Sequence, residues 1–129
     1  MESLDGKVVW ITGASSGIGK ALAAECALQG AQVILSARRL EELEKVRVSL
    51  LHPDHHLSVA MDITDEAQVR HAYEQVLDQK GRIDLLINNA GLSQRALITE
   101  TSMQTERAIM EIDYFSQVFL TKLVLPTFI

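Results

Sequence analysis

Four short runs of aliphatic residues recur along the chain, and each predicts a β-strand. They lie at residues 7–12, 32–36, 57–61 and 83–87. The runs are mostly aliphatic and do not alternate regularly between apolar and polar positions, which is typical of strands that are covered on both faces. Such strands favour a parallel sheet within an α/β domain.

The segments that connect these runs have apolar residues at helical spacing. They predict helices over residues 16–29, 40–51 and 65–79, and one long helix from about residue 102 to the region of Pro126. Regular alternation of strand and helix implies right-handed crossovers. The pattern therefore predicts a three-layer α/β fold with a doubly wound, Rossmann-like parallel sheet of about four strands.

Composition narrows the class of protein. The chain has 129 residues, a length typical of one domain, and its formal net charge of -5 argues against a nucleic-acid-binding surface. Its only cysteine, Cys26, lies in a helical pattern and is expected to be a buried structural thiol. No secretory signal and no apolar run of membrane-spanning length is visible, so we expect a cytoplasmic protein without a membrane span.

A glycine-rich turn follows the first predicted strand and precedes the first helix. Thr12 ends the strand, and Gly13, Gly17 and Gly19 follow with the spacing Gly-x-x-x-Gly-x-Gly. Backbone N–H groups and the positive end of a helix dipole at such a turn bind anions such as phosphate. Gly13 permits a sharp exit from the strand, Gly17 allows close approach of a phosphate, and Gly19 lets the helix lie near the sheet.

Other phosphate-binding glycine motifs do not fit this turn. Counted from Gly13, Ile18 stands where a P-loop requires its second glycine, and Ala21, which follows Lys20, provides no hydroxyl. A Gly-x-Gly-x-x-Gly spacing is also absent. A turn that only ends the strand is the alternative to phosphate binding.

Polar residues at the end of the second predicted strand bear on the choice of cofactor. The segment reads Ser36-Ala37-Arg38-Arg39, and no Asp or Glu occurs between Gln32 and Leu40. In a dinucleotide-binding fold, an acid at this strand end binds a free ribose 2′-hydroxyl, whereas an arginine accommodates a 2′-phosphate. Arg38, with the hydroxyl of Ser36, therefore favours NADP(H) over NAD(H), although both arginines could be ordinary surface charges.

Taken in order, these motifs resemble the short-chain dehydrogenase/reductase family. The resemblance rests on Thr12, the three glycines, Asp62 after the third strand and Asn88-Asn89-Ala90-Gly91 after the fourth; segments 37–39 and 89–95 are similar to its member-seven branch. It implies a single NAD(P)-binding Rossmann domain over residues 1–129, incomplete at its C-terminus. The implied cofactor-binding residues are Gly13, Ser15, Ser16, Gly17, Ile18, Gly19, Ser36, Arg38, Arg39, Asp62, Ile63, Asn89, Ala90 and Gly91.

The same resemblance gives individual roles to some of these residues. It implies that Asp62 accepts a hydrogen bond from the adenine amino group, with Ile63 beside it. It implies that residues 88–91 tie the sheet to the glycine turn and lie along the cofactor ribose. The alternative for Asp62 is that it only caps a turn.

The catalytic residues of the family are largely absent. The family reaction is hydride transfer between nicotinamide and a carbonyl or secondary alcohol, with proton exchange through Tyr-x-x-x-Lys. Leu77 stands four residues after Tyr73, and Val118 stands four residues after Tyr114, so neither tyrosine has the required lysine. We therefore expect the 129-residue chain alone to be inactive. The remaining candidate is Asp113, at a position where the family has Asn; a solvated helix acid is the alternative. The resemblance also implies a homo-oligomer formed through the last helix.

Rival functions remain open. A non-catalytic dinucleotide-binding or scaffolding module is one, since the catalytic residues are missing. A methyltransferase is another, but it would need an acid where Arg38 stands. The histidine-rich segment 52–56 could suggest a metal, yet it lies in a predicted loop, so a solvated turn without metal is the expectation.

Overall fold

The computed structural model describes residues 4–89, 103 and 116–128, which contain one parallel sheet of four strands. The strands lie in the order β3-β2-β1-β4. Since the chain goes from β1 to β2 and β3 on one side and then returns to β4 on the other, the strand order reverses next to β1. Such a point of reversal is where α/β sheets bind ligands. The strands are β1 Val8–Thr12, β2 Gln32–Ser36, β3 Leu57–Ser58 and β4 Leu85–Ile87.

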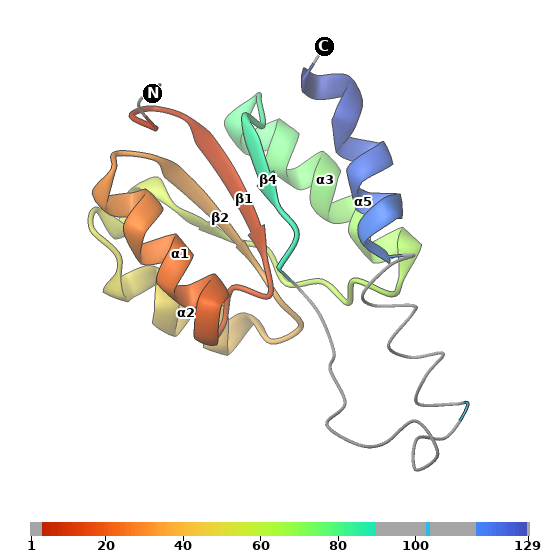
Figure 1. Cartoon of the computed structure of the whole chain (residues 1–129), viewed down its shortest axis with the longest axis horizontal. Coiled ribbons are helices and arrows are strands. Elements are labelled where there is room, and N and C mark those ends of the chain that lie inside the picture. Colours follow the sequence, from red (N-terminus) through yellow and green to blue (C-terminus); the bar gives the residue numbers. More distant parts are fainter. Residues whose placement is uncertain (1–3, 90–102, 104–115, 129) are drawn as a thin grey trace.

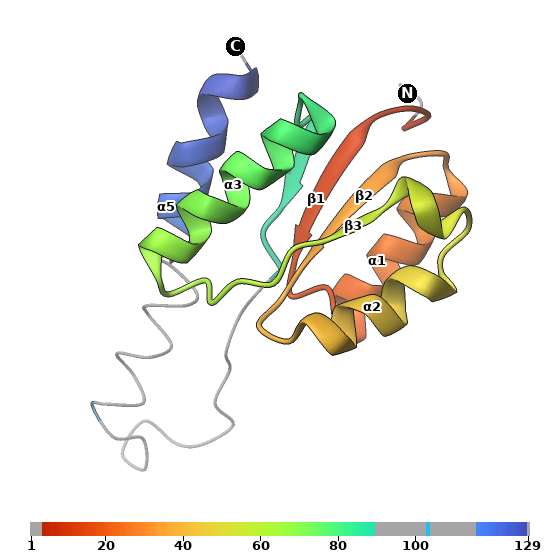
Figure 2. The ribbon, with the colours of Figure 1, turned by 180° about the vertical axis from the view of Figure 1, so that it is seen from behind.

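Helices cover both faces of the sheet and give the molecule three layers. α1 (Gly17–Leu28) and α2 (Leu40–Ser49) lie on one face (Figure 1). α3 (Glu66–Lys80) and α5 (Ser116–Val124) lie together on the other face, as the reverse view in Figure 2 shows. The Rossmann-like parallel α/β fold predicted from the sequence is confirmed.

The central strand β1 contributes to two separate hydrophobic cores, because its side chains alternate between the faces of the sheet. Val9 and Ile11 pack in the core beneath α1 and α2. Val8 and Trp10 pack in the core beneath α3 and α5, which Leu120 helps to close. All five residues of β1 are buried. Each large apolar side chain buried in this way stabilises the fold by about 1.5–3 kcal/mol, so both layers depend on β1.

The third strand is shorter than predicted. It ends at Ser58, whereas the apolar run continues to Met61. The chain nevertheless stays beside β2, because the N–H of Val59 donates to the carbonyl of Leu35 and the N–H of Met61 donates to that of Ala37, at 2.8 and 2.9 Å. This path carries residues 61–64 to the carboxyl end of the sheet.

The N-cap of α3 is Asp65, so the helix begins one residue later than the predicted range 65–79. Asp65 Oδ1 accepts hydrogen bonds from the N–H groups of Ala67 and Gln68 at 3.0 and 3.2 Å. A carboxylate is well suited to this position because it also meets the positive end of the helix dipole. At the other end, Gly81 has φ of 76° and terminates the helix.

The last predicted helix is seen in part. The described part of it is α5, and a short 3₁₀ turn, η4 (Leu125–Phe128), follows α5 and contains Pro126. Met103, which falls within this predicted helix, is 62 % exposed. The rest of the predicted helix, including Ile112 and Phe115, lies outside the described residues.

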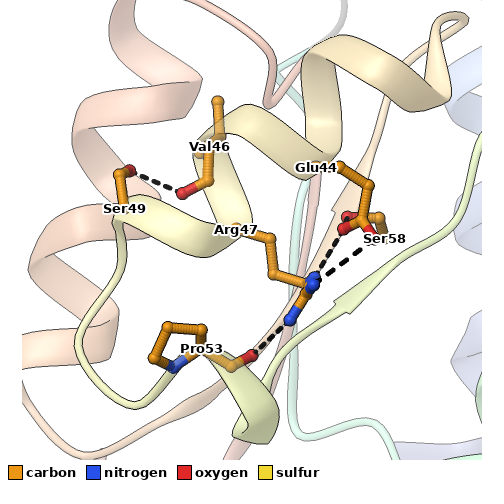
Figure 3. Close-up of polar contacts among 6 residues, drawn as sticks. All are labelled: Glu44, Val46, Arg47, Ser49, Pro53 and Ser58. Atoms are coloured by element: carbon orange, nitrogen blue, oxygen red, sulfur yellow. Dashed lines mark hydrogen bonds and ion pairs between the residues drawn. The ribbon is translucent and has the colours of Figure 1, made fainter.

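A polar network fixes the end of α2 to the loop that leads into β3 (Figure 3). Arg47 donates to the carboxylate of Glu44 and to the carbonyl oxygen of Pro53, the latter at 3.0 Å, in the 3₁₀ turn η1 (Pro53–His55). Ser58 Oγ of β3 donates to Glu44 Oε2 at 2.9 Å. The hydrogen bond from Arg47 is the main cause that lowers the pKa of Glu44. The carboxylate therefore joins a helix, a turn and a strand.

One histidine of segment 52–56 is structural, although the sequence favoured a solvated turn. The His56 side chain is 6 % exposed, and its Nδ1 accepts a hydrogen bond from the N–H of Val33 in β2 at 3.0 Å. Its Nε2 lies 2.7 Å from the carbonyl oxygen of Leu51, so this nitrogen carries the proton. Burial lowers the pKa of His56, which agrees with the neutral ring that this arrangement needs.

Candidate functional site

A cavity of about 490 Å³ opens at the carboxyl ends of β1 and β2 and beside the segment that follows β3. Its volume is in the range of about 300–1,000 Å³ typical of small-molecule sites. Three chain segments form its wall, together with one residue of α2. The lining residues are Thr12, Gly13, Ser15, Ser16, Ser36, Ala37, Arg38, Arg39, Glu42, Met61, Asp62, Ile63 and Thr64.

The glycine turn has a backbone that few other residues adopt. Gly13 and Gly17 have φ of 62° and 56°, in the left-handed region where a side chain is strained. At Gly19 the constraint is space, because an added Cβ would lie 2.2 Å from the carbonyl oxygen of Gly13 and 2.6 Å from Asn89 Nδ2. The first turn of α1 can therefore lie directly against the turn and the end of β4 only if residue 19 has no side chain.

The N-terminus of α1 is open to an anion. Its N-cap, Ser16, makes no side-chain capping hydrogen bond, and the first turn of the helix contains no acidic residue. The first helical backbone bond runs from the N–H of Lys20 to the carbonyl of Ser16. The preceding N–H groups, at residues 17–19, point along the helix axis toward the positive end of the dipole. This arrangement suits a phosphate.

Asn89 connects the end of β4 to the glycine turn. Its N–H donates to the Thr12 hydroxyl oxygen at 2.9 Å, and its Nδ2 donates to the carbonyl oxygen of Gly13 at 3.2 Å. Asn88, which the resemblance also implied to tie the sheet to the glycine turn, is exposed, and its Nδ2 donates to Thr121 Oγ1 of α5 at 3.0 Å. The two asparagines thus attach β4 to the cavity on one side and to α5 on the other.

Ser36 and Arg38 have different environments although both line the cavity. Ser36 is 1 % exposed, and its Oγ accepts a hydrogen bond from Trp10 Nε1 at 2.9 Å. Trp10 therefore fixes the Ser36 hydroxyl, which keeps its own proton as a donor. Arg38 and Arg39 are exposed, and no ion pair of the described residues includes either guanidinium. Both can therefore contact an anionic group without first breaking a salt bridge.

Asp62 is held in place by the residue two positions later. Its Oδ1 accepts hydrogen bonds from the N–H and from the hydroxyl of Thr64, at 2.9 and 2.7 Å. These hydrogen bonds keep the pKa of Asp62 below its ordinary value, and the charge of Arg38 acts in the same direction. Asp62 is thus an ionised acceptor. It closes a turn, as in the alternative stated above, and it also faces the cavity.

Metal binding has no support in the part of the chain that the structure describes. Over residues 4–89, 103 and 116–128, no group of three or more His, Cys, Asp or Glu side chains is placed to hold a metal ion. Within the same residues, no helix is both long and apolar enough to cross a lipid bilayer.

A model of the family described as short chain dehydrogenase matches residues 7–129. The chain belongs to this family. The human protein named dehydrogenase/reductase SDR family member 7 is 44 % identical over 124 residues, which cover 92 % of this chain and 37 % of the human protein. The SDR family protein 7-like protein of Anopheles gambiae is 42 % identical over 132 residues, 96 % of this chain and 41 % of the mosquito protein. The predicted similarity to the member-seven branch is confirmed.

Solved structures of short-chain dehydrogenases have the same fold. One from Streptomyces avermitilis is 36 % identical, with a TM-score of 0.89, and the match covers 95 % of this chain and 44 % of that one. A 3-ketoacyl-(acyl-carrier-protein) reductase from Brucella melitensis, complexed with NADH, is 34 % identical with a TM-score of 0.92, covering 98 % and 51 %. The chain thus spans about two fifths of the curated relatives described above and about half of these structures.

The residues predicted to bind cofactor in this short-chain dehydrogenase fall into three groups. Gly17, Ile18 and Gly19 form the first turn of α1, and Asn89 contacts the glycine turn. Ala90, Gly91 and the catalytic candidate Asp113 lie outside the described residues. The remaining eight line the cavity: Gly13, Ser15, Ser16, Ser36, Arg38, Arg39, Asp62 and Ile63.

Sequence reasoning missed two polar residues of the cavity. Glu42 and Thr64 line it, and neither was among the residues predicted to bind cofactor. The feature of the sequence that could have identified Glu42 is its position three residues after Arg39, because residues with this spacing on a helix share a face. The glycine turn, the open helix N-terminus and the arginines together fit a dinucleotide phosphate cofactor.

Proposed function

We propose that this chain is the NADP(H)-binding part of an oxidoreductase that transfers hydride between nicotinamide and a carbonyl or secondary alcohol. When bound, the cofactor supplies the hydride chemistry. The chain's own residues bind and orient it: the turn and α1 hold phosphate, Asp62 accepts from the adenine amino group, and Asn89 keeps the turn closed.

One observation supports the proposed preference for NADP(H). Arg38 and Arg39 line the cavity at the end of β2, with neither guanidinium in an ion pair of the described residues. A guanidinium presents a planar set of donors to a phosphate. The related Brucella reductase is complexed with NADH, so binding of a nicotinamide dinucleotide is supported by the family, while the choice between the two cofactors depends on the residues at this strand end.

Replacing Arg38 tests this preference. The variant Arg38→Asp removes the phosphate partner and places a carboxylate where it can accept from a ribose hydroxyl. NADPH affinity should fall about 10- to 100-fold, as expected for the loss of a charge-assisted pair of about 1.5–3 kcal/mol, while NADH affinity stays equal or rises. Titration with both cofactors at fixed salt measures it. Wild-type protein that binds NADH as tightly as NADPH would sink the proposal.

We infer that these 129 residues do not carry out hydride transfer on their own. They contain no Tyr-x-x-x-Lys pair to exchange the proton that accompanies the hydride. General acid–base groups typically contribute about 10²–10⁴-fold, and loss of positioning costs more. For these residues alone, a dinucleotide-binding module without catalysis is therefore the supported function.

An NADPH oxidation assay with a panel of ketones and aldehydes checks this inference. Purified chain should show no turnover above the background rate at high protein concentration. Turnover that persists through purification and disappears in a Gly19→Ala variant would contradict it, because such activity would require the glycine turn of this chain.

We also infer that the protein self-associates. β4 is one of the two outer strands of the described sheet, next to β1 only, and Leu85 on it is 40 % exposed. An outer strand of apolar residues is a template for further pairing. The last helix, α5, lies on the neighbouring layer and is the second surface that we assign to a homo-oligomer.

A further inference from the structure

The cavity is lined by two arginines and two carboxylates, and one carboxylate comes from a helix. Arg38 and Arg39 follow β2, and Asp62 follows the third strand. Glu42 lies instead in the first turn of α2, three residues after Arg39. The wall of the cavity that contains the arginines therefore also carries a negative charge. This charge comes from α2 and not from the end of β2.

Contacts of Glu42 leave its charge available to a ligand. Its Oε1 lies 3.3 Å from Lys45 Nζ, and the two side chains are 45 % and 75 % exposed. Exposed ion pairs of this kind are weak because water screens both charges. Among the ion pairs of the described residues, none joins Glu42 to Arg38 or Arg39. The carboxylate is thus not neutralised by the groups that would bind phosphate.

A carboxylate and a guanidinium have opposite effects on the binding of an adenosine ribose with a 2′-phosphate. A phosphate monoester carries a charge of about −1.5 to −2 near neutral pH, so it is attracted by an arginine and repelled by a glutamate. A ribose 2′-hydroxyl carries no charge and donates a hydrogen bond to a carboxylate. An acid in this cavity therefore favours NAD(H), wherever in the sequence it originates.

We propose that Glu42 is a specificity-determining residue that opposes Arg38 and Arg39 and limits the preference for NADP(H). This rests on the proposed function, because it requires the cavity to hold the adenosine ribose. Cofactor choice is then a balance between the arginines at the end of β2 and one acid on α2. Removal of the Glu42 charge increases selectivity for the 2′-phosphate.

The chain offers a matched control for this test. Glu42→Gln removes the charge and keeps the shape of the side chain. Glu41→Gln makes the same change in net charge on the same helical turn, at an exposed residue that does not line the cavity. Suitable probes are adenosine 2′,5′-bisphosphate and 5′-AMP, which differ only in the 2′-phosphate. Their dissociation constants are measured by calorimetry at low ionic strength, without any assay of activity.

The ratio of the two dissociation constants decides the outcome. In Glu42→Gln, preference for the bisphosphate should rise about three- to tenfold over wild type, and the rise should shrink with added salt. In Glu41→Gln it should change by less than about twofold. An unchanged or lower preference in Glu42→Gln, or an equal rise in Glu41→Gln, overturns the proposal.

If the proposed function is wrong, the two probes give a different pattern of binding. A wild-type protein that prefers 5′-AMP contradicts the NADP(H) preference, but the shift produced by Glu42→Gln can still be measured. A protein that binds neither probe overturns both proposals. A wild-type preference for the bisphosphate that Glu42→Gln leaves unchanged overturns only the role of Glu42.

Discussion

Two glycines of the same turn are required for different physical reasons, and alanine substitutions can distinguish the two reasons. Gly17→Ala meets nothing within 4 Å but has φ of 56°, so the backbone strain should cost about 1–2 kcal/mol. Gly19→Ala collides with the carbonyl of Gly13 and with Asn89, and overpacking of this kind typically costs about 1–3 kcal/mol. We expect the larger loss of stability, and loss of cofactor binding, in Gly19→Ala.

Urea unfolding followed by circular dichroism measures both costs. Gly6→Ala is the control, because Gly6 has φ of 74° and open space around it, and it precedes β1 at the end of the strand opposite the cavity. It should lose stability to about the same degree as Gly17→Ala. A Gly19→Ala variant as stable as wild type would contradict the close contact between α1 and the glycine turn.

At the residue scale, the sequence predicted those site residues that follow strands. Ser36, Arg38 and Asp62 could be placed together because parallel strands bring their carboxyl ends to one edge of the sheet. Glu42 could not be placed in this way, since which face of a helix meets a cavity depends on how the helix packs. The Trp10–Ser36 hydrogen bond joins residues 26 positions apart, and nothing in the local pattern of either residue indicates it.

At the scale of elements, His56 makes the attachment of β2 to the loop before β3 depend on pH. Its pKa is lowered chiefly by burial, and the charges of His55, Lys80 and Arg47 also lower it. The unfolded chain therefore binds a proton at higher pH than the folded chain. The stability due to neutral His56 is complete above the unfolded-state pKa of about 6.5 and is lost as the pH falls below it.

Unfolding measured between pH 7.5 and pH 5 checks this dependence. Protonation removes the acceptor for the N–H of Val33, so about 1–3 kcal/mol should be lost. His56→Gln should be less stable at pH 7.5 and should lose less on acidification. His55→Gln, at an exposed neighbour, should follow wild type. Identical pH slopes for wild type and His56→Gln would contradict the structural role of His56.

Element boundaries were predictable where local chemistry fixes them. The glycine that ends α3 has a positive φ, and the strand β2 has the bounds that its apolar run predicts. The shortened β3 was not predictable, because an apolar run shows burial but does not show where pairing with β2 becomes irregular. The buried state of His56 was likewise hidden, since three histidines occur within five residues and only packing distinguishes them.

At the scale of the whole molecule, the outer position of β4 allows the proposed self-association to be tested. Light scattering of the protein at increasing concentration should give a mass above that of the 14.3 kDa chain. Leu85→Lys places a charge on this outer strand and should shift the protein toward the monomer. Leu28→Lys, at an exposed residue of α1 on the opposite layer, is the control. A stable monomer at high concentration would contradict the inferred homo-oligomer.

The buried position of Trp10 gives the molecule a built-in optical probe. Trp10 is the only tryptophan of the chain, is 0 % exposed, and donates its indole N–H to a serine that lines the cavity. Its fluorescence is therefore that of a shielded indole in the folded protein and shifts to longer wavelength on unfolding. Reduced nicotinamide absorbs where tryptophan emits, so a bound reduced cofactor quenches this emission by energy transfer. Unfolding and cofactor binding can thus both be followed in unlabelled protein, from one chromophore in β1.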